Sequence, residues 1–350
     1  MTIVDLAAQF TAQPGYLAAC TGGLPSLRTQ EAIREDLARW SIGDLDAARY
    51  VTHVERSRVA YAELVGVAPE RVAIGAQVSG MVSLIAAAVP DGAEVLAVSG
   101  EFSSLTHPFE RQAHRGVTVR YVELAELPGE ITPETYLVAY SLVQSATGAL
   151  APQAEILRAA REAGALTLAD LTQATGWLPV NAAENDATIC HAYKWLCSPR
   201  GTAFLTLSPE LTEAVNPTQA GWASADDIWG SCYAGNTPLG SHANRFDVSP
   251  AWQAWVGTAA ALELFDRETV ERIHEHDLRL ANAFRAGIGS APGDSAIVTW
   301  ADPDGSALAQ ISAAGITASG RAGNARVAFH IWNTDADVAA LLAALGRAAG

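Results

Sequence analysis

Cysteine is scarce in this chain of 350 residues, which contains only Cys20, Cys190, Cys197 and Cys232. A disulfide-stabilised secreted fold needs more cysteines, and a structural zinc site needs Cys or His pairs a few residues apart. The four scattered residues fit neither pattern. We therefore expect no disulfide framework and no metal site, and the cysteine content is typical of a protein from the reducing cytoplasm.

Positive charge is also in short supply, since 22 Lys+Arg residues against 38 Asp+Glu residues give a formal charge of −16. Surfaces that bind nucleic acid or anionic membranes carry clusters of Lys and Arg. The sequence has no such cluster, so we expect neither kind of partner. A pocket that binds an anion must then supply its own positive charge.

Long apolar segments are missing as well. A helix that crosses a bilayer needs roughly 18 apolar residues or more, and the nearest approach, Met81–Pro90, is interrupted by Ser83. The N-terminal sequence MTIVDLAAQFTAQ lacks the basic start and the apolar core of a secretory signal. These features predict a cytoplasmic protein that is not bound to a membrane.

Short apolar segments that alternate with amphipathic ones are present instead. We expect strands at Val72–Ile74, Glu94–Val98, Val117–Val122, Tyr136–Tyr140, Leu166–Asp170, Thr188–Cys190 and Thr202–Leu207. Helices are expected at Ser79–Val89, Leu105–His114 and Gln153–Ala163. This βαβα order predicts an α/β fold with a mainly parallel sheet, helices on both of its faces, and ligands bound at the carboxyl ends of the strands.

The pattern changes near Pro250. A long, charged helix is expected over Ala251–Arg285, with a break near Arg267. The later elements are strands at Ala296–Thr299 and Asn324–Ile331 and helices at Ser306–Ala314 and Asp335–Leu345. We therefore divide the chain into an N-terminal arm (residues 1–25), a large domain (26–250) and a small α+β domain (251–350). The arm is expected to pack against one domain or the other.

A lysine and an aspartate lie at the ends of predicted strands. Lys194 stands between the strands at 188–190 and 202–207, so its amine is expected at the edge of the sheet where ligands bind. A buried lysine is costly unless it loses its proton or its charge is used, and Schiff-base formation with an aldehyde cofactor uses it. Asp170 ends a buried strand, and a pyridinium nitrogen would give its carboxylate a cationic partner.

Each of these residues alone has a plainer interpretation. A lysine before an aromatic residue is usually on the surface, and an aspartate at a strand end usually caps a turn. Their order along the chain, together with Gln173 and the turn Pro199-Arg200-Gly201, favours a functional site over two unrelated surface residues.

Two motifs resemble those of the class V aminotransferase superfamily, whose members are fold-type I enzymes that use pyridoxal 5′-phosphate (PLP). They are Ala169-Asp170-Leu171-Thr172-Gln173 and Tyr193-Lys194-Trp195-Leu196-Cys197-Ser198-Pro199-Arg200-Gly201. The second motif is similar to the isopenicillin N epimerase-like branch, and the superfamily also includes cysteine desulfurases, kynureninases and carbon–sulfur lyases. The resemblance extends from about Gly75 to Leu345. It implies the PLP-dependent transferase fold type I, PLP as the cofactor, and a homodimer with a shared active site.

The resemblance also implies which residues bind the cofactor. Lys194 would carry it, Asp170 would pair with the ring nitrogen, and Gln173 would pair with the ring hydroxyl oxygen. The loop Gly75–Val78 would bind the phosphate with backbone amides, which an adjacent helix dipole favours. The other implied positions are Ala76 and Gln77 in that loop, Phe102 or Ser103 over the ring, Ser145 near the ring and substrate, His191 and Tyr193 at the phosphate, and Ser249, which would reach a phosphate across the dimer interface.

Arg326 is implied as the residue that binds the substrate carboxylate, through two parallel hydrogen bonds. A solvated strand residue is the alternative interpretation, and Arg321 is a weaker candidate for the same role. In one desulfurase branch the mobile loop before this arginine carries a nucleophilic cysteine. The corresponding segment here, Ala318–Gly323, has none, so we do not expect persulfide chemistry of that kind.

Several other residues that stand out in the sequence are expected to have structural rather than catalytic roles. Cys190 and Cys197 flank the lysine but are expected to pack as small apolar groups. His274 and His276 are two residues apart on a predicted helix, so they do not share a face, and we expect them at the surface rather than as metal ligands. Three tryptophans, Trp222, Trp229 and Trp252, could line a substrate pocket, but we favour core or dimer contacts.

The function implied is that of a PLP-dependent enzyme of amino-acid metabolism, which acts on an α-amino acid through an external aldimine with Lys194 as the general base. We favour a lyase that performs β-elimination or cleaves a C–S or C–C bond. An aminotransferase or epimerase is the alternative, because the reactions diverge only at the leaving group and the site of reprotonation. A non-catalytic PLP-fold binding protein and an α/β protein without PLP are alternatives of another class, and the retention of Lys194, Asp170, Gln173 and Arg326 argues against them.

Overall fold

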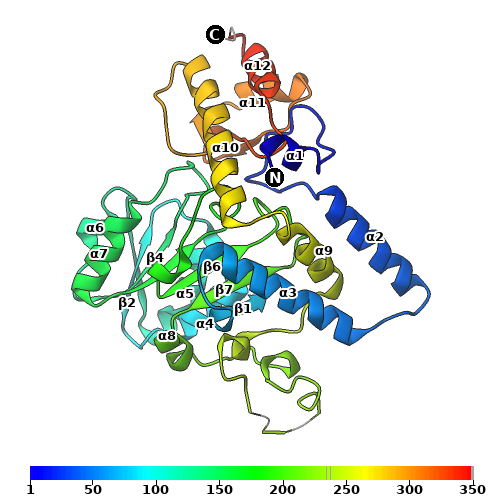
Figure 1. Cartoon of the computed structure of the whole chain (residues 1–350). Helices are drawn as coiled ribbons and strands as arrows, with labels where there is room; N and C mark the ends of the chain where they lie inside the picture. Colours follow the sequence, from blue (N-terminus) through cyan, green and yellow to red (C-terminus); the bar gives the residue numbers. More distant parts are fainter. Residues whose placement is uncertain (234, 237, 348–350) are drawn as a thin grey trace.

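A seven-stranded sheet forms the centre of the computed structural model, which describes residues 1–233, 235–236 and 238–347 (Figure 1). The strands are β1 (Val72–Gly75), β2 (Glu94–Val98), β3 (Thr118–Val122), β4 (Thr135–Ser141), β5 (Leu166–Asp170), β6 (Ala187–His191) and β7 (Ala203–Leu207), in the order β1-β7-β6-β5-β4-β2-β3. Strand β7 is antiparallel to its neighbours β1 and β6, whereas the other neighbouring strands are parallel. The prediction of a mainly parallel sheet is confirmed.

Helices cover both faces of this sheet. The helices of this part are α2 (Leu27–Ser41), α3 (Ala47–Val65), α4 (Val78–Ala88), α5 (Ser103–Glu110), α6 (Leu127–Glu130), α7 (Gln153–Ala163), α8 (Pro209–Ala214) and α9 (Trp252–Leu262). Alternate residues of a strand face opposite sides. In β4, Leu137 and Ala139 belong to one core cluster with α4 and α5, whereas Val138 and Tyr140 belong to another with α3 and α7. The central strands are therefore buried on both faces, as in other α/β proteins.

The C-terminal part contains a second, antiparallel sheet. Its elements are α10 (Arg267–Gly287), β8 (Ile297–Ala301), α11 (Ser306–Ala313), β9 (Ser319–Arg321), β10 (Asn324–Ala328) and α12 (Asp335–Ala344), with the strand order β8-β10-β9. The expected break in the long helix lies between α9 and α10, where Asp266 caps α10 by accepting a hydrogen bond from the Thr269 amide at 2.7 Å. The division of the chain at residue 251 stays a prediction, because α9 itself packs against α2 and α3.

The segment 318–323 forms strand β9 and a tight turn with positive φ at Ala322 and Gly323. The expectation of histidines at the surface needs correction, because His274 and His276 are half-buried. The ring of His274 stacks on Trp177 at a centroid distance of 5.6 Å, and a ring nitrogen of His276 lies 3.0 Å from the carbonyl oxygen of Asn333. Burial lowers the pKa of both histidines.

The N-terminal arm contacts both parts of the molecule rather than one. After the short helix α1 (Ile3–Ala7), the amide of Leu17 donates to the Thr317 carbonyl, and the Leu17 carbonyl accepts from Ala328 in β10. The amide of Gly23 then donates to the Tyr193 carbonyl, 2.9 Å away and directly before Lys194. The arm thus connects the C-terminal sheet to the loop of the predicted catalytic lysine.

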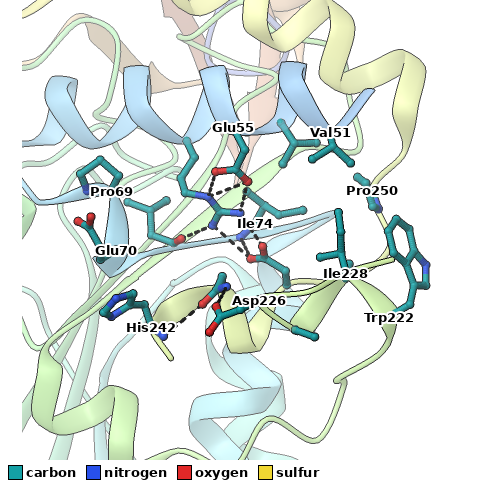
Figure 2. A pocket seen from close by; sticks show the side chains of 17 residues that line it. Val51, Glu55, Pro69, Glu70, Ile74, Trp222, Asp226, Ile228, His242 and Pro250 are labelled. Carbon is teal, nitrogen blue, oxygen red and sulfur yellow. Dashed lines mark hydrogen bonds and ion pairs between the residues drawn. The ribbon is translucent and has the colours of Figure 1, made fainter. Parts of the chain in front are cut away.

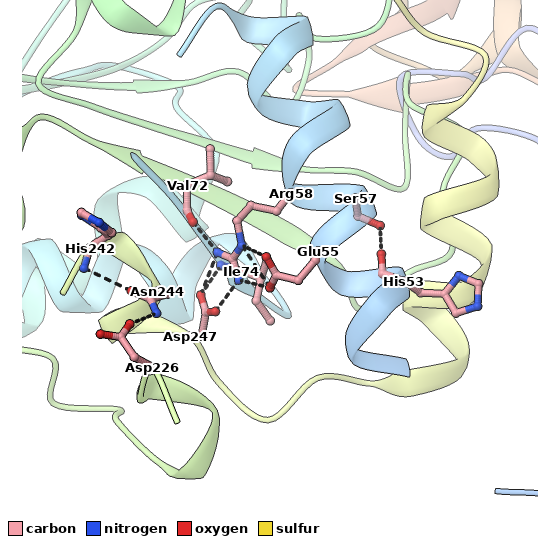
Figure 3. Close-up of polar contacts among 10 residues, drawn as sticks. All are labelled: His53, Glu55, Ser57, Arg58, Val72, Ile74, Asp226, His242, Asn244 and Asp247. Atoms are coloured by element: carbon pink, nitrogen blue, oxygen red, sulfur yellow. Dashed lines mark hydrogen bonds and ion pairs between the residues drawn. The ribbon is translucent and has the colours of Figure 1, made fainter. Parts of the chain in front are cut away.

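A buried ion pair anchors the segment that leads to Ser249 (Figure 3). Arg58 of α3 lies 2.5 Å from a carboxylate oxygen of Asp247, and the same carboxylate accepts from the Ile74 amide of β1 at 2.8 Å. Burial raises the pKa of Asp247 to about 6 although Arg58 lowers it. Loss of either partner would leave an uncompensated buried charge, so this pair fixes residue 247 against α3 and β1.

A pocket lies beside this ion pair, between α3 and the segment 222–250 (Figure 2). Trp222 lines it and stacks on Trp229 at 5.6 Å, while Trp252 stacks on Tyr50 at 4.8 Å. Trp222 lines a pocket and Trp229 is 49% exposed, so the assignment of the three tryptophans to core or dimer contacts stays a prediction. In the described part of the chain, none of the helices combines the length and the apolar character that a membrane crossing requires.

Candidate active site

A second pocket opens where the carboxyl ends of β1, β4, β5 and β6 meet, the edge at which α/β sheets bind ligands. It contains most of the residues that the sequence had implied for the cofactor. Those that line it are Gln77, Phe102, Ser145, Asp170, Gln173, His191, Tyr193 and Lys194. Segments separated by more than a hundred residues are therefore brought together in one place.

Lys194 is the only lysine of the whole chain, because every other residue counted as Lys+Arg is an arginine. Arginine cannot replace it in a Schiff base, since guanidinium stays protonated in proteins. The side chain is 6% exposed, and its amine lies 5.6 Å from the ring centre of Phe102. Burial lowers the pKa of Lys194 to about 8, although Asp170 raises it. The lack of any second lysine was a signal in the sequence that pointed to this residue and had been overlooked.

The backbone of the lysine loop is held tightly. The Lys194 carbonyl accepts from the amide of Cys197 at 3.0 Å, and Cys197 has a positive φ of 54°. Gly23 of the arm packs directly on this turn. A Cβ atom at Gly23 would lie 2.0 Å from the Lys194 carbonyl oxygen and 2.9 Å from the Cα atom of Cys197, so only glycine fits between the arm and the loop.

Asp170 ends β5 and is buried in the pocket floor. One carboxylate oxygen accepts from the Thr172 amide at 2.8 Å, and the Thr172 hydroxyl accepts from the His191 amide at 3.0 Å. Burial raises the pKa of Asp170, while Thr172 and the charge of Lys194 lower it. The carboxylate therefore needs a further cationic or hydrogen-bond-donating partner from within the pocket.

His191 has a ring nitrogen without a partner. Its Nε2 atom is buried and has no hydrogen bond within the described chain, although the residue lines the pocket. Burial, together with the nearby charges of Arg200 and Lys194, lowers the pKa of His191 to about 4. The ring is therefore neutral near physiological pH, and it can offer one donor or one acceptor to a ligand.

The N-terminus of α4 points into the same pocket. Gln77 is its N-cap but makes no side-chain cap hydrogen bond, and Val78 and Ser79 of the first turn line the pocket. The first amides of a helix have no partner within the helix, and the helix dipole favours an anion there. Since α4 has 11 residues, this terminus can hold a phosphate together with His191.

Gln173 is hydrogen-bonded to three other residues. Its carbonyl oxygen accepts from the Trp195 indole at 2.8 Å, and its amide nitrogen donates to the Ser145 hydroxyl at 3.0 Å and to the Cys20 carbonyl at 2.9 Å. An amide oxygen can accept two hydrogen bonds, so a ring hydroxyl can donate to this oxygen without replacing any of these contacts. Gln173 also connects the arm, the lysine loop and the loop that follows β4.

Arg326 of β10 lies behind Ser145 and is 1% exposed, so the alternative interpretation as a solvated strand residue is wrong. Its guanidinium donates to the Ser145 hydroxyl at 3.1 Å and to the Ser145 carbonyl. Further bonds of 3.1 Å reach the hydroxyls of Ser319 and Thr21. Burial lowers the pKa of Arg326. The charge is thus met by neutral acceptors within the described chain, next to the pocket.

The structure does not bring four implied residues into this pocket. Ala76 and Ser103 are exposed beside it, and Ser104 rather than Ser103 lines it. Ser249 is exposed near the other pocket, and Arg321 is exposed in β9, where it donates to the neighbouring Gly320 carbonyl at 2.6 Å. Their proposed roles remain predictions.

Five further residues that line the pocket had not been assigned a role of their own: Ser79, Ser104, Ser141, Thr172 and Arg200. The guanidinium of Arg200 lies 4.8 Å from the ring centre of Tyr193. Ser141 is held by the carboxylate of Glu101, which accepts from its hydroxyl at 2.5 Å and from its amide at 3.0 Å. Burial and the nearby Asp170 raise the pKa of Glu101. Its position three residues after the carboxyl end of β2, at the edge of the sheet that also holds Asp170, was the available signal.

These groups together fit PLP. A single buried amine can bond to the aldehyde, and the Asp170 carboxylate can hold a proton on the ring nitrogen. The unpartnered His191 Nε2 and the free amides of α4 can hold the phosphate. The pocket thus offers a complementary group for the reactive carbon, the ring and the anion of this cofactor.

Comparison with known proteins agrees with this chemistry. The family model described as aminotransferase class-V matches residues 47–320. Isopenicillin N epimerase of Streptomyces clavuligerus is 34% identical over 184 residues, which are 48% of this chain and 46% of the epimerase. The chain therefore spans about half the length of this curated relative, whose activity is not transferred by the match alone.

Solved structures show the same fold. A cysteine desulfurase of Thermococcus onnurineus NA1 superposes with a TM-score of 0.85 at 19% identity, over 99% of this chain and 97% of that one. The cystine C–S lyase C-DES, in complex with its product cysteine persulfide, gives a TM-score of 0.85 at 21% identity, over 95% and 97% of the two chains. The expectation of fold type I is confirmed.

Replacement of the buried lysine should make the cofactor-free protein more stable in a pH-dependent way. The pKa of Lys194 is about 8 in the folded chain and about 10.4 in an unfolded chain. Below about pH 8 the amine is charged in both states, so we expect Lys194→Met to raise the free energy of unfolding by about 3 kcal/mol. Between the two pKa values the unfolded state binds more protons. The stability of the wild type therefore rises relative to the variant as the pH increases.

Urea unfolding of both proteins across this pH range measures the difference. Lys194→Arg is the matched control, because arginine stays charged over this range. The difference in free energy of unfolding between Lys194→Arg and Lys194→Met should therefore not become smaller as the pH rises. A wild-type difference that is constant with pH would contradict the assignment of a desolvated Lys194.

Proposed function

Since the chain belongs to the class V aminotransferase family of PLP-dependent enzymes, we propose that it is a lyase that breaks a C–S or C–C bond, or eliminates a β-substituent, of an α-amino acid. The observation that carries this proposal is the buried amine of Lys194, which shares one pocket with the Asp170 carboxylate and the N-terminus of α4. The fold shared with a cysteine desulfurase and a cystine C–S lyase supports the lyase assignment. The named relative among the epimerases supports epimerisation as the second candidate.

Each residue of the pocket has a separate role in this proposal. When bound, PLP takes up the negative charge that develops at the α-carbon of the substrate. The Lys194 amine, with its pKa of about 8, is partly neutral near physiological pH and can take the α-proton as a general base. Asp170 holds the proton at the ring nitrogen, while His191 and the α4 amides bind the phosphate. The pocket walls exclude water from the Lys194 amine.

Arg326 is the proposed site for the substrate carboxylate. Its guanidinium now donates to neutral oxygens of Ser145, Ser319 and Thr21. A carboxylate that replaced one of these acceptors would form charge-assisted hydrogen bonds, which are roughly twice as strong as neutral ones. Thr21 is exposed on the arm, so its contact is the easiest of these to exchange.

Covalent trapping tests the role of Lys194. We expect borohydride reduction of the protein with PLP to attach the cofactor to one peptide, because the chain has a single lysine. Mass spectrometry of a digest should find the adduct at residue 194, and Lys194→Ala should lose it. A wild-type protein without any adduct at saturating PLP would remove the basis of the proposal. The N-terminal amine is present in both proteins, so any adduct found there measures unspecific labelling.

A panel of amino acids then separates the reactions. Ammonia released together with a 2-oxo acid indicates a lyase, and so does alanine formed together with zero-valent sulfur, which an added thiol reductant releases as sulfide. A 2-oxo acid whose nitrogen stays on the protein indicates an aminotransferase, and inversion of configuration without either product indicates an epimerase.

Substitution of the two arginines tests the carboxylate site with the amino acid that the panel identifies. Arg326→Gln should raise KM by about 10- to 100-fold, the loss expected for hydrogen bonds to a charged group. Arg321→Gln is the matched control on the neighbouring strand and should change KM little, because its side chain is exposed. The opposite result would assign the carboxylate to Arg321. Equal KM values for the two variants and the wild type would place it elsewhere.

We also propose a homodimer in which Ser249 reaches the partner's cofactor phosphate. Ser249 is exposed, and the preceding segment exposes Trp229 by 49% and the side chain of Tyr233 completely. Burial of such exposed aromatic side chains in an interface would remove apolar surface from water. Sedimentation velocity should give about twice the mass of the 36.6 kDa chain, and Ser249→Ala should weaken PLP binding while the dimer persists. A monomer that binds PLP fully would contradict this assembly.

A further inference from the structure

A buried histidine–aspartate pair that does not line the pocket contacts the lysine loop. His330 follows β10, Asp277 lies on α10, and both side chains are 0% exposed. The Nδ1 atom of His330 lies 3.1 Å from a carboxylate oxygen of Asp277. Its Nε2 atom lies 2.9 Å from the carbonyl oxygen of Trp195, the residue that follows Lys194. The pair thus joins two C-terminal elements to the peptide of the predicted catalytic lysine.

The two contacts of His330 require an additional proton. A backbone carbonyl can only accept a hydrogen bond, so Nε2 must carry a hydrogen. The contact between Nδ1 and Asp277 then holds a second proton, either on the imidazole or on the carboxylate. In both cases the histidine donates to Trp195 in a fixed ring orientation, since the other nitrogen is also bonded. Asp277 therefore fixes the ring orientation in which His330 Nε2 donates to the Trp195 carbonyl.

The Trp195 carbonyl has little freedom to move away from this donor. Gly176, with φ of 115°, packs against it so closely that a Cβ atom there would lie 2.6 Å from the oxygen. The Trp195 indole also packs edge-on against His330 at 5.1 Å and donates to Gln173 at 2.8 Å. One residue therefore transmits the position of the pair to two residues of the pocket, Lys194 through the chain and Gln173 through the indole.

Stability alone gives a poor reason for such a pair. Burial raises the pKa of Asp277, and its second carboxylate oxygen has no hydrogen-bond partner among the described residues. An unsatisfied buried acceptor costs about 1–3 kcal/mol, and apolar residues often replace buried ion pairs without loss of stability. Apolar residues would therefore fill this space at a lower cost in stability. They could not, however, donate a directed hydrogen bond to Trp195.

We propose that His330 and Asp277 are positioning residues, which hold Lys194 and Gln173 in their reactive orientation through the carbonyl and the indole of Trp195. The inference rests on the proposed role of Lys194. Neither residue lines the pocket, so the pair acts on the reaction only through Trp195.

Two amide side chains of different length at residue 330 separate positioning from packing. The side-chain nitrogen of His330→Gln can take the place of Nε2 and donate to Trp195, whereas His330→Asn is too short to reach it. Both substitutions remove the ring and should lower stability alike. We expect His330→Asn to reduce kcat by up to about 100-fold, because misplacement of a reacting group has effects of that size, with KM nearly unchanged. His330→Gln should restore most of kcat.

A spectroscopic signal reports on the lysine independently of turnover. Isotope-labelled lysine gives a single backbone amide resonance, because Lys194 is the only lysine. In the PLP-loaded protein this resonance should shift in His330→Asn and in Asp277→Leu, which removes the acceptor of Nδ1, and should return towards the wild-type position in His330→Gln. Melting temperatures of all variants control for general loss of structure.

The outcomes distinguish this inference from the proposed function. Equal kcat values and unshifted lysine resonances in the Gln and Asn variants, with the PLP adduct present at Lys194, would overturn the positioning role alone. A wild type that forms no adduct would instead overturn the proposed function. Even then, the lysine resonance of the three variants would show whether the pair orders the loop.

Discussion

Burial of one amine is the constraint on which the arrangement of this protein depends. An ammonium group withdrawn from water is costly unless it is deprotonated or paired, and Lys194 is 6% exposed with Asp170 as its main source of compensating charge. The pocket that satisfies this requirement is made at the carboxyl ends of parallel strands. Strand ends alone would leave the lysine loop free to move, so the rest of the chain is used to fix it.

Fixation comes from segments that are distant in the sequence. The arm reaches the loop at Gly23, where a larger residue has no room, and the C-terminal part reaches it at His330. Ser145 connects Gln173 to Arg326 of β10 in the same way. The arm and the C-terminal sheet are therefore part of the site, although the residues that line the pocket come mostly from the large sheet. A displacement of the arm or of the C-terminal sheet would therefore change the position of Lys194.

Much of this could be predicted from the sequence because strand ends are local. The apolar runs located β5 and β6 closely, so Asp170 and Lys194 were placed at one sheet edge. Contacts such as those of Gly23 and His330 could not be predicted, since they depend on how elements far apart in the chain pack. The antiparallel orientation of β7 could not be predicted for the same reason. His274 and His276 were misplaced because a charged helix pattern does not reveal which polar residues face a neighbour such as Trp177.

Substrate choice must depend on other residues than those that bind PLP. Asp170, His191 and the start of α4 are complementary to groups that the cofactor brings to every reaction, so they cannot distinguish one amino acid from another. The exposed groups at the pocket mouth are different: Phe102 is half exposed, and Arg200 lies over Tyr193. In a chain of formal charge −16, the cations Lys194, Arg200 and Arg326 concentrate positive potential at this one edge, which attracts anionic ligands.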